Sequence, residues 1–420
     1  MKKLQLSITF FLILLSLPVR SQVKVEITLD EFLYKIQNAN IEYLAERLNM
    51  EIAEASIISA SVFNNPSIGL SYYNNELKSM QMGHGAFAEL SQTISPGRRS
   101  AAIDVAKSEK ELAAALLTDY FRKLREEAVN LWLDAVKLRQ LIQIKKDSYD
   151  DQIKLMESDS LRRGIEFNRD LDILQNRVET GKLFAELADM DKEMFDICIQ
   201  LTNMSGISVA DSMIVPQRRN IFNEKHFDLQ ELLAKAIANR ADILAARKET
   251  DVSKYMLKAA KTERIPEFDV FLGYGINAEV RNELAPAPKF NGFEVGISFP
   301  IPLFNRNKGE IMSAQSQLKQ AEYRYLQAEN QVKEEVVTAH KTYMHTSNKL
   351  NLFKSGLVKN AKDALEQKKA QYYNREIHLI EVLDAQRSYD EVLASFYSAI
   401  YDKSQALVTL ESAVGVWNIE

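Results

Sequence analysis

The sequence has little cysteine, glycine or proline for its length of 420 residues. Cys198 is the single cysteine, which excludes an intramolecular disulfide and a metal site built from paired cysteines. Gly occurs 14 times and Pro 9 times, mostly within a few short segments. Because both residues interrupt helices, their scarcity over long stretches predicts a chain that is mostly α-helical with a small β part.

Long apolar runs are also missing beyond the N-terminus. After residue 21 no window of eighteen apolar residues occurs, so we expect any membrane-spanning segments to be strands rather than helices. No cysteine follows residue 21 before the first expected helix, which argues against an N-terminal lipid anchor. No Gly-rich phosphate loop and no nucleophile motif occurs either, so we expect neither an enzyme nor a cofactor.

The N-terminus has the pattern of an export signal peptide. Lys2 and Lys3 precede an apolar run at residues 4–17, and cleavage is expected after Ser21. Loss of these two lysines and Arg20 changes the formal charge from −5 to −8. This acidic balance argues against a nucleic acid as partner.

The remaining chain contains an internal repeat with an offset of about 200 residues. LDEFLYKIQNANIEYLAER at 29–47 aligns with LQELLAKAIANRADILAAR at 229–247, and seven of the twenty positions from 28 to 47 are identical. We therefore predict a signal peptide at 1–21, a first repeat at 22–205, a linking segment at 206–227 and a second repeat at 228–420.

Each repeat is expected to contain a helix, two strands, a very long helix and a returning helix. The first helices are expected at about 29–62 and 228–263, the long helices at 98–158 and 304–371, and the returning helices at 166–204 and 377–415. Strands are expected at about 66–75, 85–95, 266–276 and 291–301. The strand pattern is clearest in Phe293, Val295 and Ile297, which alternate with small or polar residues.

The long helices carry a different period. Large apolar residues and alanines recur in steps of three and four, the 3.5-residue period of a coiled-coil seam. In the first repeat they are Leu117, Phe121, Leu124, Ala128, Leu131, Ala135, Leu138 and Ile142. In the second they are Ile311, Ala314, Leu318, Ala321, Tyr325, Ala328 and Val332. Sixty residues of helix reach roughly 90 Å, which is too long for a compact core and predicts an elongated protein.

Four strands leave two open sheet edges, which lipid does not tolerate. If the strands cross a membrane, several chains must therefore complete one β-barrel. Two chains would supply eight strands and fill the barrel with side chains, whereas three would supply twelve and leave a lumen.

Three further motifs give the chain a family resemblance. They are LSQTISPGRR (90–99), FPIPLFNRNKG (299–309) and IEVLDAQRSY (380–389). In this order, and with the duplicated plan, the mature sequence resembles the TolC family of outer-membrane efflux ducts. The form of the first motif resembles that of the metal-cation efflux branch of the family.

The resemblance implies a homotrimer in the outer membrane that extends into the periplasm. Its fold would be a twelve-stranded outer-membrane β-barrel continued by a periplasmic α-helical barrel. The function implied is that of a passive exit duct in a tripartite efflux system. Its partners would be outer-membrane lipid, a periplasmic adaptor and an inner-membrane pump of the resistance-nodulation-division type.

The resemblance also assigns residues to a periplasmic gate and to docking tips. The acids at the narrow end of the duct would be Glu381 and Asp384, with Asp172 as the first-repeat counterpart of Glu381 and either Arg375 or Arg387 as a bridging cation. The turns that contact the adaptor would include Arg163, Gly164, Asn374 and Arg375. Asn374 is expected to take the left-handed backbone that relatives give to Gly.

Other interpretations stay open. Met80, Met82 and His84, in the loop between the first two strands, form a weak candidate site for a soft cation. The main alternative to a duct is a soluble periplasmic coiled-coil scaffold without transport activity.

Overall fold

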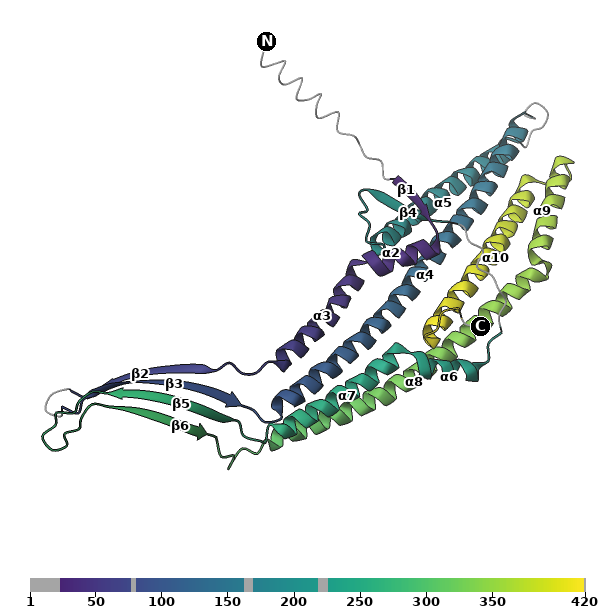
Figure 1. Ribbon diagram of the computed structural model, residues 1–420. Coiled ribbons are helices and arrows are strands. Elements are labelled where there is room, and N and C mark those ends of the chain that lie inside the picture. Colours follow the sequence, from purple (N-terminus) through teal and green to yellow (C-terminus); the bar gives the residue numbers. More distant parts are fainter. Residues whose placement is uncertain (1–22, 77–80, 162–168, 218–225, 419–420) are drawn as a thin grey trace, which may run out of the picture. The chain divides into compact units, whose positions relative to one another are not determined.

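The structure is a computed structural model that describes residues 23–76, 81–161, 169–217 and 226–418 (Figure 1). In chain order its elements are β1 (Val23–Ile27), α2 (Leu29–Ala39), α3 (Ile41–Ser61), β2 (Ser67–Asn74), β3 (His84–Ile94), α4 (Arg98–Leu161), α5 (Arg169–Met204), β4 (Ser212–Pro216), α6 (Leu229–Asn239), α7 (Ala241–Thr262), β5 (Phe268–Asn277), β6 (Phe290–Ser298), α8 (Lys308–Leu352), the π-helical turn η1 (Phe353–Leu357), α9 (Val358–Tyr373) and α10 (Leu379–Val414). The predicted mainly helical fold with four short strands is confirmed. The predicted signal peptide lies outside the described residues.

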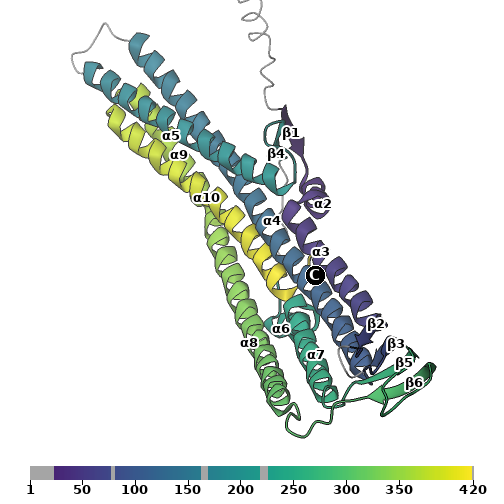
Figure 2. The same cartoon turned by 90° about the vertical axis from the view of Figure 1, so that its left-hand side faces the viewer.

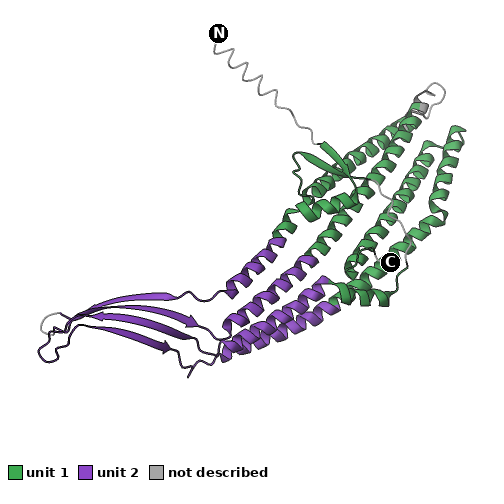
Figure 3. Ribbon diagram, viewed as in Figure 1, with its two compact units in different colours: residues 1–46, 119–240, 331–420 green, residues 47–118, 241–330 purple. Residues whose placement is uncertain are grey.

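The chain divides into two compact units, coloured separately in Figure 3. Unit 1 contains residues 1–46, 119–240 and 331–420, and unit 2 contains residues 47–118 and 241–330. Each unit therefore takes segments from both predicted repeats.

The sheet of unit 2 has the strand order β2-β3-β5-β6, with every neighbouring pair antiparallel. Its register places Ile68, Leu90, Leu272 and Val295 in one row across the four strands. Alternation along each strand extends this row into an apolar face, which is exposed in the isolated chain. β6 ends at Ser298 rather than at 301, because Pro300 and Pro302 have no backbone N–H for a ladder.

Two aromatic residues that break the apolar alternation lie on the opposite, glycine-rich face. Phe87 of β3 lies over Gly273 of β5, and Phe271 of β5 lies over Gly296 of β6, so that a methyl group at either glycine would collide with the ring. The rings cover backbone that the glycines would otherwise leave bare. The irregular pattern of these strands thus has a packing cause.

The helices of unit 2 are connected by ion pairs in the order α3, α4, α7, α8. Lys110 of α4 pairs with Glu54 of α3, and Asp104 of α4 pairs with Lys258 of α7. Arg324 of α8 pairs with Glu249 of α7. Each of these exposed pairs stabilises the fold little, so packing of the predicted alanine-rich seam supplies more. The seam residues Ala314 and Ala321 are buried, as predicted.

The core of unit 1 is built around Trp132 of α4. Its ring lies 5.2 Å from the ring of Phe32 of α2, and both side chains are fully buried with Leu201 of α5 and Ile214 of β4. β4 pairs in parallel with β1. Neither strand is among the four expected, because each is only five residues long and its partner is nearly 190 residues away.

The first helix of each repeat is broken, which corrects the expectation of continuous helices at 29–62 and 228–263. Asn40 separates α2 from α3, and Arg240 separates α6 from α7, with nearly the same extended backbone (φ −65°, ψ 121° and φ −66°, ψ 124°). Each side chain donates a 2.9 Å hydrogen bond to a carbonyl near the end of the returning helix, Asn40 to Met204 and Arg240 to Ala413. These bonds satisfy helix-terminal carbonyls and hold the breaks in place.

The second long helix is also interrupted, whereas α4 runs unbroken through 64 residues. Gly356 in η1 has φ 113°, a conformation that side chains other than Gly rarely adopt, so α8 and α9 are separate elements. The expected helix at 304–371 is therefore wrong in its continuity, and it begins later, at Lys308.

Candidate functional site

The turn between α9 and α10 reverses the chain within five residues, and the two helices lie side by side in both views (Figures 1 and 2). The Arg375 amide donates to the Tyr372 carbonyl (3.0 Å) and the Glu376 amide to the Gln371 carbonyl (2.9 Å), the pair of bonds that defines a Schellman motif. Arg375 therefore takes the left-handed backbone (φ 68°), whereas Asn374 stays right-handed (φ −79°). The expectation that Asn374 adopts the left-handed conformation is wrong by one residue.

Glu381 lies in the first turn of α10 and contacts the preceding helix. Its Oε2 accepts a 2.7 Å hydrogen bond from Lys368 Nζ of α9. The hydrogen bond from Lys368 lowers the pKa of the Glu381 carboxyl, and the charge of Lys368 and the His378 backbone act in the same direction. Glu381 is thus an ionised carboxylate with a cation beside it.

Asp384 belongs to an arginine-centred network one turn further along α10. Arg387 donates from Nη1 to Asp384 (3.2 Å) and from Nε and Nη2 to both carboxylate oxygens of Glu179 on α5 (3.1 and 2.8 Å). The hydrogen bond from Arg387 holds the pKa of Glu179 below its ordinary value. Arg387, one of the two expected bridging cations, therefore connects α10 to α5.

Asp172 lies in the first turn of α5 and is half-buried. An acid in a first helical turn interacts favourably with the helix dipole, which is a structural reason for its presence. The structure places Glu381, Asp384 and Asp172 near the starts of the two returning helices of unit 1.

A buried polar cluster was missed by the sequence reasoning. Asp390 of α10 accepts hydrogen bonds from Ser148 Oγ of α4 (2.6 Å) and from Gln386 Nε2 (3.0 Å), and its burial raises the pKa of the carboxyl. Gln152 of α4 donates to Asn176 of α5 (2.8 Å), and both are almost fully buried. One feature of the sequence could have indicated it. Further steps of three, four and three residues from the seam residue Ile142 lead to Gln152, which therefore continues the predicted coiled-coil seam.

Two groups of predicted residues are described in part or not at all. Arg163 and Gly164 of the first turn lie outside the described residues, as does Met80. Met82 is exposed, and His84 Nδ1 lies 3.2 Å from Glu76 Oε1. In the described ranges no group of three or more His, Cys, Asp or Glu residues has the arrangement of a metal site.

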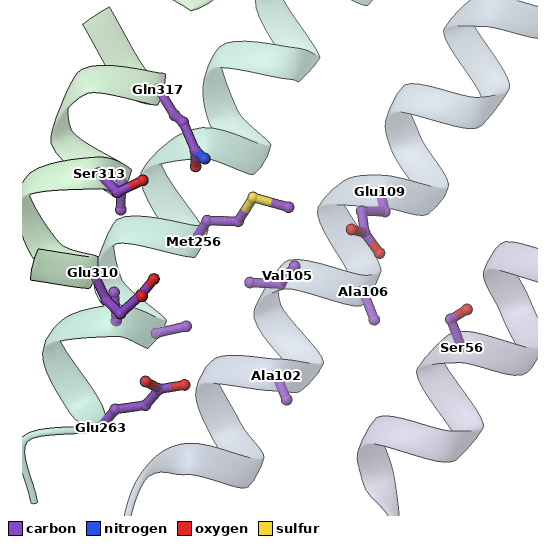
Figure 4. A pocket seen from close by; sticks show the side chains of 13 residues that line it. Ser56, Ala102, Val105, Ala106, Glu109, Met256, Glu263, Glu310, Ser313 and Gln317 are labelled. Carbon is purple, nitrogen blue, oxygen red and sulfur yellow. The ribbon is translucent and has the colours of Figure 1, made fainter. Parts of the chain in front are cut away.

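A groove of about 470 Å³ lies among α3, α4, α7 and α8 of unit 2 (Figure 4). Glu109, Glu263 and Glu310 line it together with small residues such as Ala102 and Ser313. Glu263 already accepts a 3.0 Å hydrogen bond from Asn307 Nδ2. The Ser56 hydroxyl donates a 3.0 Å hydrogen bond to the Ile52 carbonyl of its own helix.

No helix in the described part of the chain is both long and apolar enough to cross a bilayer.

Comparisons with known proteins agree on one family. The model of the outer membrane efflux protein family matches residues 232–416. The cobalt-zinc-cadmium resistance protein CzcC of Cupriavidus metallidurans is 22% identical over 390 residues, which cover 93% of this chain and 90% of CzcC. The outer membrane protein TolC of Vibrio cholerae is 25% identical over 223 residues, about half of each chain (51% and 50%).

The fold has the same relatives. The solved structure of the outer-membrane channel OprN superposes with a TM-score of 0.74 at 15% identity, covering 93% of this chain and 90% of OprN. Sequence and fold comparisons thus both lead to outer-membrane proteins. The chain is thus similar to outer-membrane efflux proteins: the family model matches its second half, and the similarity to CzcC extends over nearly its whole length.

Proposed function

We propose that three copies of this chain form the outer-membrane exit duct of a tripartite efflux system. The observation that carries the proposal is the sheet of unit 2, which has an apolar face open to the surroundings. The exposed fractions of Ile68, Leu70 and Phe293 on this face are 74%, 80% and 67%. A patch of this kind is rare on a soluble monomer and matches the lipid-facing surface of membrane strands.

The sheet edges support closure by further copies. β2 pairs only with β3 and β6 only with β5 in the four-stranded sheet, so both outer edges carry unpaired backbone groups. α3 likewise has no buried residue in the isolated chain. Antiparallel pairing of β6 with β2 of a neighbouring copy would remove the edges, and three copies would give twelve strands with room for a lumen.

The acids of α10 are the proposed gate. Arg387 connects α10 to α5 through Glu179, so movement of the α9–α10 pair away from α5 must break this bridge. Glu381 and Asp384 of three copies would place six carboxylates around one axis, an arrangement that favours cations. Asp172 is the proposed counterpart on α5.

The α9–α10 turn, with Asn374 and Arg375, and the first turn, with Arg163 and Gly164, are the proposed docking tips for a periplasmic adaptor. An inner-membrane pump of the resistance-nodulation-division type would supply the energy, since the family is one of passive channels. The long match to CzcC supports divalent metal cations as the cargo.

Membrane fractionation followed by planar-bilayer recording tests the proposal. The duct predicts a trimer in the outer-membrane fraction that only detergent extracts and that conducts ions after reconstitution. A soluble monomer in the periplasmic fraction would instead establish the alternative, a scaffold without transport activity. Sensitivity of a deletion strain to cobalt, zinc and cadmium, measured beside dyes and detergents, tests the cargo.

A further inference from the structure

The junctions between strands and helices in unit 2 combine exposed apolar side chains with exposed cations. The pairs Ile94–Phe268 and Asp269–Ser298 place the ends of β3, β5 and β6 that are nearest the helices at the same end of the sheet. We name residues 95–99, 261–267 and 299–308, which follow or precede these ends, the junction collar.

The apolar face of the sheet continues into the collar beyond the last paired residue. Phe299, Ile301 and Leu303 follow Phe293, Val295 and Ile297 at every second position. Their exposed fractions are 55%, 69% and 65%, and that of the next residue, Phe304, is 99%. Since side chains two apart lie on one face of an extended chain, Phe299 and Ile301 prolong the apolar face past the end of the ladder. The chain then turns at Pro302, where the Leu303 amide donates to the Ile301 carbonyl (2.8 Å).

Cations lie next to this apolar segment without partners. Arg264, Arg306 and Lys308 are exposed and have no ion pair within the part of the chain that the structure describes. The acids of the collar are already engaged, because Glu267 pairs with Arg98 (2.9 Å) and Glu263 accepts from Asn307 (3.0 Å).

These two bonds also fix the collar in place. Asn307 Nδ2 donates in addition to the Ala260 carbonyl (3.0 Å), so the segment that carries Arg306 and Lys308 is held against the end of α7. In a chain with a formal charge of −5, the collar is therefore a cationic surface on an anchored backbone.

We propose that the junction collar binds the phosphate headgroups of anionic phospholipids at the periplasmic side of the outer membrane. The proposal rests on the membrane location of the sheet given under Proposed function. Apolar side chains followed directly by Lys and Arg are the pattern that places aliphatic groups among acyl chains and charges among headgroups. Continuity with the sheet face favours a lipid over free phosphate, which would leave Phe299, Ile301 and Leu303 in water.

The test measures lipid bound to the purified full-length protein by native mass spectrometry. Phosphatidylglycerol and phosphatidylcholine with the same acyl chains are titrated separately, and sn-glycerol 3-phosphate is added as a competitor without acyl chains. The variant Arg264→Gln/Arg306→Gln/Lys308→Gln removes the unpaired cations. Each cation near a membrane surface contributes about fivefold to the affinity for anionic lipid, so we expect a loss of roughly a hundredfold for phosphatidylglycerol.

The control Lys319→Gln/Lys333→Gln/Lys359→Gln makes the same charge change at exposed lysines of α8 and α9. It should retain the affinity of the unmodified protein, as should Arg264→Lys/Arg306→Lys, which keeps the collar charge if the glutamine variant does not assemble. Equal binding of both lipids, equal losses in the two triple variants, or full competition by glycerol phosphate would overturn the proposal.

Recording in planar bilayers of either lipid separates this inference from the proposed function. If channels conduct in both lipids but show no preference for phosphatidylglycerol, the duct is supported and the proposed lipid site is contradicted. A protein that never inserts contradicts the duct itself.

Discussion

Replacing Arg387 with Gln should shift the duct toward its open state. Arg387 forms two hydrogen bonds to Glu179, whose side chain is 15% exposed, while that of Arg387 is 46% exposed. A hydrogen bond to a charged group contributes about 1.5–3 kcal/mol when buried, and solvent screening at this exposure reduces the bridge to about 1 kcal/mol. If all three copies open together, the closed state loses about 3 kcal/mol of stabilisation, which is roughly a 150-fold change in the closed-to-open ratio.

Single-channel recording in planar bilayers measures this ratio as the fraction of time in the high-conductance state. Lys182→Gln is the matched control, because Lys182 lies 3.7 Å from the same Glu179 but belongs to α5 itself and does not connect α5 to α10. It should leave the ratio close to that of the unmodified channel. Equal behaviour of the two variants would refute the bridge as part of the gate.

The bridge also predicts a direction for the effect of pH. Its hydrogen bond lowers the pKa of Glu179 in this structure, so the stabilisation is present above the ordinary glutamate pKa and is lost as pH falls through the lowered pKa. Acidification below the ordinary carboxylate range should therefore open the unmodified channel. The same acidification should change Arg387→Gln much less.

Three further outcomes are expected. Replacing Glu381 and Asp384 together with Ala should raise conductance and weaken block by multivalent cations in bilayer recordings, and unchanged block would remove them from the gate. Gly206→Ala should lower the free energy of unfolding by several kcal/mol, because φ at Gly206 is 70° and a methyl group there would collide with a backbone carbonyl. Gly181→Ala, in open space on α5, should raise the free energy of unfolding by about 1 kcal/mol. Burial raises the pKa of Asp390, so stability should fall as pH rises through that pKa, and Asp390→Asn should flatten this dependence in thermal unfolding at several pH values.

The strands and seams were predictable from the sequence because their periods record a local environment. Val295 and Ile297 alternate since one face of β6 is apolar, and Ala314 and Ala321 recur since neighbouring helices approach closely there. The breaks at Asn40 and Arg240 were not predictable in this way. Neither residue is a helix breaker, and each break depends on a hydrogen bond to a helix end more than 160 residues away.

The proposed gate shows the same limit. Family motifs indicate which acids lie after the second turn, but a motif carries no information on which cation each acid contacts. Lys368 reaches Glu381 from thirteen residues earlier, and Arg387 reaches Glu179 across 208 residues. The contact of Arg387 with Glu179 therefore became visible only from the packing of α5 against α10.

The two repeats share backbone geometry more closely than side-chain chemistry. Asn40 and Arg240 have the same φ and ψ within a few degrees, yet Arg240 also reaches Glu335 (2.7 Å), which the shorter Asn side chain could not do from the same position. The offset of 209 residues that aligns Asp172 with Glu381 places Asp159 at the position of Lys368. The sequence therefore has an acid where the cation beside Glu381 stands in the second repeat, and we expect a gate built from both repeats to respond to pH or cations through its two helix pairs unequally.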